Sequence, residues 1–500
     1  MLDRIFKLGK ESAIYGLSSI VGRFLNFLLV PFYTNFLFKA ELGTVGYLYS
    51  YIAFAFVIYG YGMDSAYMRF VASLETGDKK QTVSAPFFSL LGTSFLFSLL
   101  IYFSASSIGD LLDAGPEHAN LVGHAGLVLF IRYSAWILFF DTLAIVPFAY
   151  LRMENKAKLF AGLRILNIVI TVVLTVILFV SFQMRVDVVF IANLIASAFT
   201  ALVLVWIVSP QLTLRIPAKL YKEMLGFGLP YIPASLAGIA IQVIDRPILK
   251  ALTDNETVGI YTANYRLGVL MMLVVGMFDY AWRPFFLTHA KDSDAPKLFS
   301  KVFTYFVALL MFVFVTGTMF IDDIVRIRLF GGYFIGPGYW GGLKIVPVIL
   351  LAYVFTGAYV NFVVGVYLEK KTKYLPYATG AGAAANIIAN YLLIPKFGIM
   401  GAAIATLISY IVMAAGIYFP SQRFYHVEYE WGRILRLCLA TGTVVGLFLA
   451  IHPDPATLSG ISMKLAFTAL FILLIFVLRV FDSADIKETK NALARMFTRP

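Results

Sequence analysis

The feature of this sequence that most constrains its fold is a series of long apolar runs that continues along the whole chain. A membrane-spanning helix needs about 20 predominantly apolar residues. Charged residues make up only 14% of the 500 residues and apolar residues 60%, which leaves too little polar surface for soluble domains. We therefore predict an all-α polytopic membrane protein. Its fourteen predicted spans fall at 13–37, 43–71, 82–106, 122–150, 158–181, 186–208, 224–251, 257–280, 302–321, 342–367, 375–394, 398–420, 437–451 and 462–481.

The distribution of Lys and Arg predicts the orientation of these spans. An even number of spans puts both termini on one side, and 26 of the 40 Lys and Arg residues fall in the segments on that side. Seven fall on the other side and seven within spans. Because cytoplasmic loops are enriched in Lys and Arg, we predict that both termini are cytoplasmic. Basic loops beside anionic lipids also account for the net charge of +12 without a nucleic-acid partner.

Two stretches of the chain, 15–43 and 227–259, resemble one another. Each begins with an aromatic residue followed by Gly-Leu and ends with an apolar residue followed by Gly. An even number of spans separates them, which is typical of parallel repeats, so we predict two pseudo-symmetric six-helix lobes plus two C-terminal helices. The predicted segments are a cytoplasmic or interfacial N-terminal segment (1–12), an N-lobe of spans 1–6 (13–208), a cytoplasmic linker (209–223), a C-lobe of spans 7–12 (224–420), spans 13–14 (421–481) and a cytoplasmic tail (482–500).

Three arginines fall near the bilayer midplane in this layout. At 1.5 Å per residue, Arg23, Arg132 and Arg266 lie roughly 14–15 Å into their spans, about half of the 30 Å hydrocarbon core. A charge at this depth costs about 2.5–3.5 kcal/mol on insertion scales, so it needs a partner or a wet cavity. Guanidinium donates bidentate hydrogen bonds to phosphate, and we predict a cationic cavity for an anionic headgroup, with Asn26 on the face of Arg23. Alternatively, each arginine pairs with a carboxylate and only fixes helix packing.

Three aspartates lie nearer the predicted cytoplasmic ends of their spans. Carboxylates within membrane spans often mark ion or proton pathways, so Asp64, Asp141 and Asp279 are candidate proton or sodium carriers. Alternatively, they reach the headgroups or balance Arg69 and Arg283.

Asp245 and Arg246 are neighbours near the outer end of the seventh predicted span. Adjacent residues on a helix point in different directions, so we expect a structural role and no facing pair. Pro230 and Pro233 open the same span, where proline lets a helix bend.

The sequence offers little for metal or disulfide chemistry. There is one cysteine, Cys438, and the five histidines show no ligand spacing. We therefore expect no cofactor and no metal site, with H⁺ or Na⁺ as the ion that drives any coupled transport.

Several motifs resemble those of a known family. The stretches 227–230, 245–249 and 258–263 are similar, in order and spacing, to a signature of the polysaccharide transporter family. These proteins are the O-antigen and exopolysaccharide flippases of the multidrug/oligosaccharidyl-lipid/polysaccharide superfamily. The stretches 281–285 and 397–403 and the position of Arg23 are also similar, so the resemblance covers nearly the whole chain. Its motif positions are Gly228, Pro230, Asp245, Arg246, Gly259 and Tyr261.

The resemblance implies an inner-membrane flippase that carries undecaprenyl-diphosphate-linked oligosaccharide to the periplasmic leaflet by alternating access. It implies diphosphate contacts at Arg23 and Arg266, contact with membrane lipids, and a polysaccharide polymerase and a chain-length regulator as partners. One feature departs from the related lipid II flippases: no second-span arginine lies at midplane depth, because Arg69 is at the predicted cytoplasmic end.

Three other functions would require different sequence features. A drug or cation exporter of the same superfamily favours an acidic cavity. A membrane glycan polymerase or ligase needs a large external loop, whereas the longest one expected here, 322–341, has about twenty residues and reads as a turn-rich interfacial loop. A scaffold for glycan synthesis does not need midplane arginines. The sequence therefore favours a transporter over an enzyme.

Overall fold

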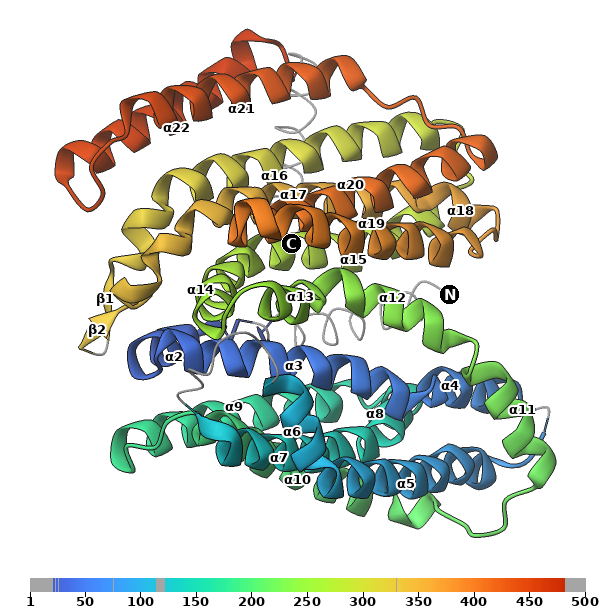
Figure 1. The fold of residues 1–500 in the computed structure, drawn as a ribbon. Coiled ribbons are helices and arrows are strands. Elements are labelled where there is room, and N and C mark those ends of the chain that lie inside the picture. The colour runs from blue at the N-terminus through green and yellow to red at the C-terminus, as the bar shows by residue number, and fades with distance from the viewer. Residues whose placement is uncertain are drawn as a thin grey trace, which may run out of the picture.

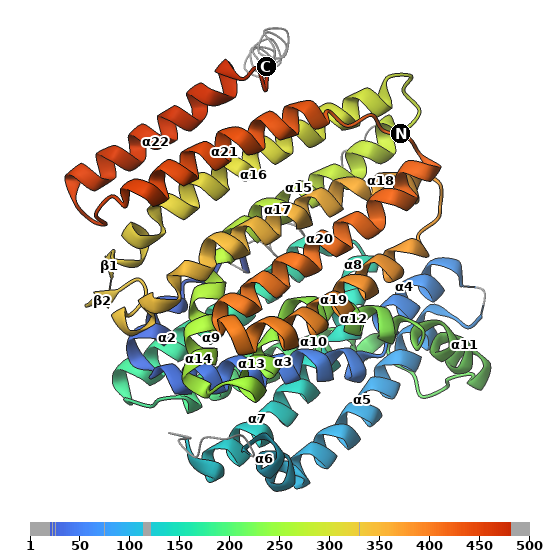
Figure 2. The ribbon, with the colours of Figure 1, turned by 45° about the horizontal axis from the view of Figure 1, so that its top comes forward.

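The computed structural model describes residues 21–481 apart from positions 23, 26, 75, 114–121 and 330. The described chain is almost entirely helical, and the axes of most of its long helices are roughly aligned with one another (Figure 1). They form two bundles, which we call the first bundle (α2 to α10) and the second bundle (α13 to α20). Figure 2 shows α21 and α22 on the outside of the second bundle, where both contact α16.

The first bundle is built around α3, α5, α7 and α10, whose neighbours in space include α9 and the short α8. Local sequence sets where some of these helices begin. The Asp78 carboxylate accepts a hydrogen bond from the Gln81 N–H (2.7 Å) at the start of α5, as capping residues do. The helices are α2 (Val30–Phe36), α3 (Lys39–Gly60), α4 (Met63–Ser73), α5 (Lys79–Phe103), α6 (Ala105–Asp113), α7 (Gly123–Leu143), α8 (Ile145–Met153), α9 (Ala157–Ser181) and α10 (Asp187–Val208).

A broken helix connects the two bundles. After the turn η1 (Ser209–Gln211), α11 (Ala218–Gly228) contacts α4 and α5 of the first bundle. The chain then breaks at Leu229 and Pro230, and α12 (Tyr231–Val243) crosses between α3 and α19. Proline at this position agrees with the bend that the sequence predicts.

In the second bundle, α20 packs most closely against α19 and α17. Its helices are α13 (Asp245–Leu252), α14 (Asn255–Tyr265), α15 (Val269–His289), α16 (Ala295–Val325), α17 (Val346–Phe362), α18 (Val364–Leu368), α19 (Tyr374–Phe397) and α20 (Ile399–Phe424), followed by α21 (Trp431–Ile451) and α22 (Leu458–Val477). Its shorter elements are η2 (Arg266–Gly268), β1 (Arg328–Leu329), β2 (Gly332–Tyr333) and η3 (Pro337–Ile345).

The two bundles approach most closely where α3 crosses α14. A Cβ atom on Gly43 would collide with the backbone carbonyl of Asn255, and one on Gly259 would collide with the carbonyl of Lys39. Only glycine allows backbones to come this close. Because the contact is reciprocal, the two halves meet through equivalent residues, in agreement with the predicted pseudo-symmetry of the lobes.

The segment 326–345 makes a second connection between the bundles, beyond the interfacial role expected for it. The strands β1 and β2 form a small antiparallel hairpin that lies against α2. We call this end of the molecule the hairpin face and the opposite end, with α4, α11 and α18, the linker face (Figure 1). The contacts across the bundles here are Asn35 Nδ2 to the Tyr333 carbonyl (2.6 Å), the Gly336 N–H to Thr34 Oγ1 (3.1 Å), the Tyr339 hydroxyl to the Leu37 carbonyl (3.0 Å) and Lys39 with Glu256 (2.7 Å).

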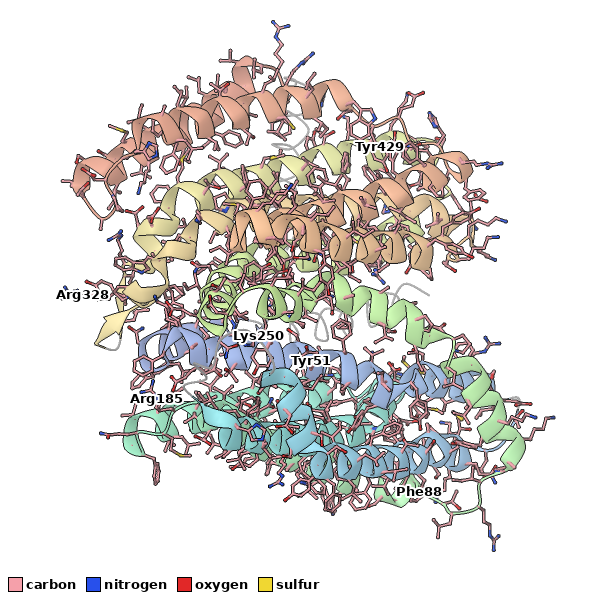
Figure 3. The ribbon with its side chains drawn as sticks, viewed as in Figure 1. Tyr51, Phe88, Arg185, Lys250, Arg328 and Tyr429 are labelled. Carbon is pink, nitrogen blue, oxygen red and sulfur yellow. The ribbon has the colours of Figure 1, made fainter. Side chains whose placement is uncertain are left out.

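Arg185 secures the first bundle at the same face. It lies in the connection between α9 and α10 (Figure 3), and its Nε and Nη2 atoms each donate a 2.6 Å hydrogen bond to Glu41 at the start of α3. These hydrogen bonds raise the pKa of Arg185. The connection is therefore fixed to the first turn of α3 by a bidentate, charge-assisted pair.

Twelve helical segments of the described chain are long and apolar enough to cross a membrane. They overlap twelve of the fourteen predicted spans. The predicted span 13–37 lies partly outside the described residues, and the predicted span 375–394 forms α19, which is helical but rich in small and polar residues. The count of fourteen stays a prediction, as does the location of both termini, because 1–12 and 482–500 lie outside the described residues.

Candidate functional site

Two adjoining polar cavities are lined mainly by helices of the first bundle and by α12, and Arg266 and Met272 of the second bundle complete one of them. The smaller, which we call the Arg266 cavity, has a volume of about 490 Å³, and the larger, the Arg164 cavity, about 640 Å³. Tyr49, Asn167 and Asn193 line both of them, so the two cavities share a wall.

Arg266 lies in η2, at the point where the predicted eighth span breaks into α14 and α15. Its guanidinium carbon is 5.2 Å from the centre of the Tyr33 ring, and both residues line the Arg266 cavity. No carboxylate oxygen of the described residues lies within 4 Å of this side chain. A cation supported by an aromatic ring and lacking an acidic partner in the described chain therefore faces the cavity.

The wall between the two cavities is a network of amides and hydroxyls from three helices. Asn193 Nδ2 donates to the Tyr49 hydroxyl (2.8 Å), and Asn167 Nδ2 donates to Thr200 Oγ1 (3.0 Å). Ser197 Oγ donates to Asn193 Oδ1 (3.3 Å). These groups form hydrogen bonds with one another and keep spare donors and acceptors for a polar ligand.

Our sequence analysis missed this wall, although a signal is present. On α9, Arg164, Asn167 and Thr171 are three and seven residues apart, which places them on one face of the helix, and all three line a cavity. The spacing of Asn193, Ser197 and Thr200 on α10 is of the same kind.

The Arg164 cavity carries charges of both signs. The guanidinium carbons of Arg164 and Arg152 lie 5.6 and 5.7 Å from the centre of the same ring, that of Phe160. Asp64 and Asp141, two of the predicted ion carriers, line the same cavity. The structure thus brings these two aspartates into one cavity, together with two arginines that the sequence analysis did not single out.

The other predicted site residues are not brought to the cavities. Arg132 lies over the Tyr102 ring (5.0 Å) and lines neither cavity, because this face of α7 is turned toward the end of α5. Asp279 is 2.9 Å from Arg283 in an ion pair on α15 and also lines neither. The predicted contacts Arg23 and Asn26 lie outside the described residues.

One expectation about the family-motif residues is wrong. Asp245 and Arg246 form a pair, with Arg246 Nη1 2.8 Å from Asp245 Oδ1. Both residues lie in the first turn of α13, and the long Arg246 side chain turns back along the helix, where it also donates to the Gln242 carbonyl (2.7 Å). The Tyr261 hydroxyl donates to the other carboxylate oxygen of Asp245 (2.5 Å). Asp245 and Arg246 are only 1% and 8% exposed, which makes this a buried polar cluster.

The remaining motif residues act through the backbone. Gly228 ends α11 against Gly62, where a Cβ atom would lie 2.7 Å from the Tyr61 carbonyl oxygen. Pro230 stands at the break before α12. Together with Gly259 on α14, these positions permit close approach or a break of helices.

Comparison with solved structures shows the fold. The lipid II flippase MurJ in an inward closed conformation superimposes with a TM-score of 0.73 at 16% identity, covering 94% of this chain and 97% of that chain. An inward-facing multidrug resistance MATE family transporter of the MOP superfamily gives 0.61 at 15% identity, with coverage of 80% and 94%. A MOP superfamily transporter from Pyrococcus furiosus gives 0.57 at 15% identity, with coverage of 83% and 95%.

The sequence itself identifies the family. No curated protein sequence matches the chain. Residues 8–288, more than half of the chain, match the family model described as polysaccharide biosynthesis protein. This match confirms the family resemblance seen in the motifs. The chain therefore belongs to the polysaccharide biosynthesis protein family and has the fold of the MOP superfamily transporters.

Proposed function

We propose that this protein is a flippase that moves undecaprenyl-diphosphate-linked oligosaccharide across the bacterial inner membrane for the assembly of O-antigen, capsule or exopolysaccharide. The observation that carries the proposal is Arg266, which faces a polar cavity and has no acidic partner in the described chain. Membership of a polysaccharide biosynthesis family and a fold like that of a lipid II flippase support it.

In this proposal the diphosphate binds at Arg266. A guanidinium donates charge-assisted hydrogen bonds to phosphate oxygens, and Arg23 and Asn26 remain predicted further contacts. The amides and hydroxyls of Asn167 and Asn193 and their neighbours contact the sugars, while the prenyl tail stays in the lipid through a lateral opening. The proposed diphosphate site does not include Arg132, because Arg132 lines neither cavity.

Transport then requires the two bundles to move relative to each other. The charge distribution of the sequence favours the linker face as the cytoplasmic side and the hairpin face as the periplasmic side. On this basis, release toward the periplasm breaks the contacts between α2 and the 326–345 segment and separates α3 from α14. The break at Pro230 lets α12 tilt while α11 stays on the first bundle.

Ion coupling belongs to the same proposal. Asp64 and Asp141 line the Arg164 cavity and are the proposed carriers of H⁺ or Na⁺. The same two carboxylates favour the second candidate function, a cation-coupled exporter of drugs or other small molecules. A polymerase and a chain-length regulator are the proposed protein partners of the flippase.

The experiment that tests the function measures the leaflet in which undecaprenyl-diphosphate-oligosaccharide accumulates, in cells that lack other flippases. We expect accumulation in the inner leaflet on depletion, relief by the intact protein, and no relief by Arg266→Gln. Arg132→Gln, at a similar predicted depth, is the matched control and should relieve it when present at the same membrane abundance. Normal flipping after depletion would overturn the proposal, and loss of drug efflux with normal surface glycan would favour the exporter.

A further inference from the structure

Arg152 and Arg164 form an unusual pair in the wall of the Arg164 cavity. They come from different helices, α8 and α9, yet both guanidiniums lie against the Phe160 ring. Arg164 also lies over Phe148, at 4.5 Å from the ring centre. Both arginine side chains are exposed, and both line the cavity. The aromatic rings hold two like charges at one place on the cavity wall.

No acid neutralises this pair at ion-pair distance. Within the part of the chain that the structure describes, no carboxylate oxygen lies within 4 Å of either guanidinium. Asp64 and Asp141 line the same cavity but are not ion-paired with the arginines. Two cations that share one ring repel each other unless an anion lies between them, so the arrangement favours a bound oxyanion.

Reaching lipid headgroups is the alternative role for arginines near helix ends. It fits Arg152, which lies in the last turn of α8. It fits Arg164 less well, because Arg164 is seven residues into α9 from Ala157, or about 10 Å along the axis. Its guanidinium faces the cavity between two rings.

A polar path connects this pair with Arg266. Arg164, Asn167 and Thr171 lie on one face of α9, and Thr171 lines the Arg266 cavity. Seven residues at 1.5 Å each separate Arg164 from Thr171 by about 10 Å. The two cationic positions therefore lie at different levels of one continuous polar surface.

We propose that Arg152 and Arg164 form a second anion-binding subsite, on the linker-face side of Arg266, for an oxyanion of the transported lipid. This inference rests on the proposed function. Two parts of such a substrate supply the oxyanion: the diphosphate, held here at a different stage of transport from Arg266, or the carboxylate of an acidic sugar, held here while Arg266 binds the diphosphate. Bidentate contact with guanidinium is common to both.

Protection from arginine modification tests the subsite in the full-length protein without any substitution. The purified protein in lipid nanodiscs is treated with phenylglyoxal, and modified arginines are located by mass spectrometry. The probes are undecaprenyl diphosphate, which has no sugar, and sodium glucuronate, which has no phosphate; undecaprenol is the uncharged control. Protection of Arg164 by undecaprenyl diphosphate identifies the diphosphate as the ligand, and protection by glucuronate alone identifies a sugar carboxylate.

Two negative results have different meanings. Protection of Arg266 by undecaprenyl diphosphate, with Arg164 modified equally under all conditions, would overturn the second subsite and leave the proposed function standing. Absence of protection at Arg266, together with absence of undecaprenyl diphosphate binding, would count against the proposed function itself.

A binding measurement in variants adds a second test. In an Arg266→Gln background, we expect undecaprenyl diphosphate to retain weak binding if Arg152 and Arg164 hold the diphosphate. Adding Arg152→Gln and Arg164→Gln should then weaken binding by about tenfold or more, the loss expected for hydrogen bonds to a charged group. Lysine at positions 152 and 164 should retain part of the affinity, because it keeps the positive charge but cannot donate the two parallel hydrogen bonds of a guanidinium. If the Arg266→Gln protein bound undecaprenyl diphosphate equally well with and without the substitutions at Arg152 and Arg164, the result would contradict a diphosphate subsite.

Discussion

Neutralising Arg246 alone is expected to destabilise the second bundle strongly. Asp245 is 1% exposed and has two side-chain partners, Arg246 at 2.8 Å and the Tyr261 hydroxyl at 2.5 Å. Arg246→Gln removes the positive charge and leaves a buried carboxylate with only neutral hydrogen-bond donors. Breaking a buried ion pair in this way costs about 3–5 kcal/mol.

Two other variants of this cluster are expected to lose less free energy of unfolding than Arg246→Gln. Tyr261→Phe removes one hydrogen bond to a charged group and keeps the ion pair, so it is expected to cost about 1.5–3 kcal/mol. The double variant Asp245→Asn with Arg246→Gln has no buried charge. It leaves neutral polar groups that are imperfectly paired, for which about 1–3 kcal/mol is expected. The double variant should therefore be more stable than either single neutralisation.

The free energy of unfolding is measured by reversible titration with sodium dodecyl sulfate in mixed micelles, followed by tryptophan fluorescence. The single variants Arg246→Gln, Asp245→Asn and Tyr261→Phe, the double variant and the parent are compared in the same lipid-detergent mixture. Arg328→Gln, an exposed position on β1, is the control. If the double variant lost as much stability as the two single variants added together, Asp245 and Arg246 would not be coupled, and our reasoning would be refuted.

Three further predictions concern contacts between segments that are distant in the sequence. Asn35→Cys with Gly332→Cys, in a Cys438→Ala background, should form a disulfide across the hairpin face and stop glycan export until a reductant is added, because the bundles are then locked together. Gly43→Leu should cost about 1–3 kcal/mol by overpacking the crossing of α3 and α14, measured by the same unfolding titration. Asp323→Asn should speed hydrogen exchange in α22, because it leaves Lys464, which is 1% exposed, without the carboxylate 2.5 Å away.

Each of these predictions has a clear contradicting result. Full export by the oxidised, crosslinked protein would mean that the hairpin face does not open during transport. An unchanged free energy of unfolding in Gly43→Leu would mean that α3 and α14 separate at no cost, whereas Gly92→Leu, at a glycine with open space around it, should be nearly neutral. Slow exchange of α22 in Asp323→Asn would show that the pair with Lys464 does not hold this helix in place.

Much of the helical architecture could be predicted because a bilayer leaves the backbone few choices. Backbone groups in lipid must be hydrogen-bonded internally, so each long apolar run becomes a helix. Twelve of the predicted spans appear as apolar helical segments of sufficient length. Counting residues along a span also gives the depth of a side chain, which is why Arg266 could be singled out.

Depth along a helix does not fix the direction in which a side chain points. Arg132 and Arg266 were expected at similar depths, but packing of α7 directs Arg132 toward Tyr102 and away from the cavities. Arg152 and Arg164 are twelve residues apart in the sequence, and only the packing of α8 and α9 brings both to the Phe160 ring.

Helix interruptions were the other feature that required the tertiary structure. The break at η2 places Arg266 at the cavity, and the break at Leu229 and Pro230 lets α12 cross between α3 and α19. The direction of a side chain decided the pair of Asp245 and Arg246, which forms within the single helix α13. The sequence by itself determined the family, the apolar helices and the midplane charges, because these depend on local composition and on the bilayer. The cavities, their polar wall and the arginine pair were decided by helix packing, because they depend on which faces of distant segments meet.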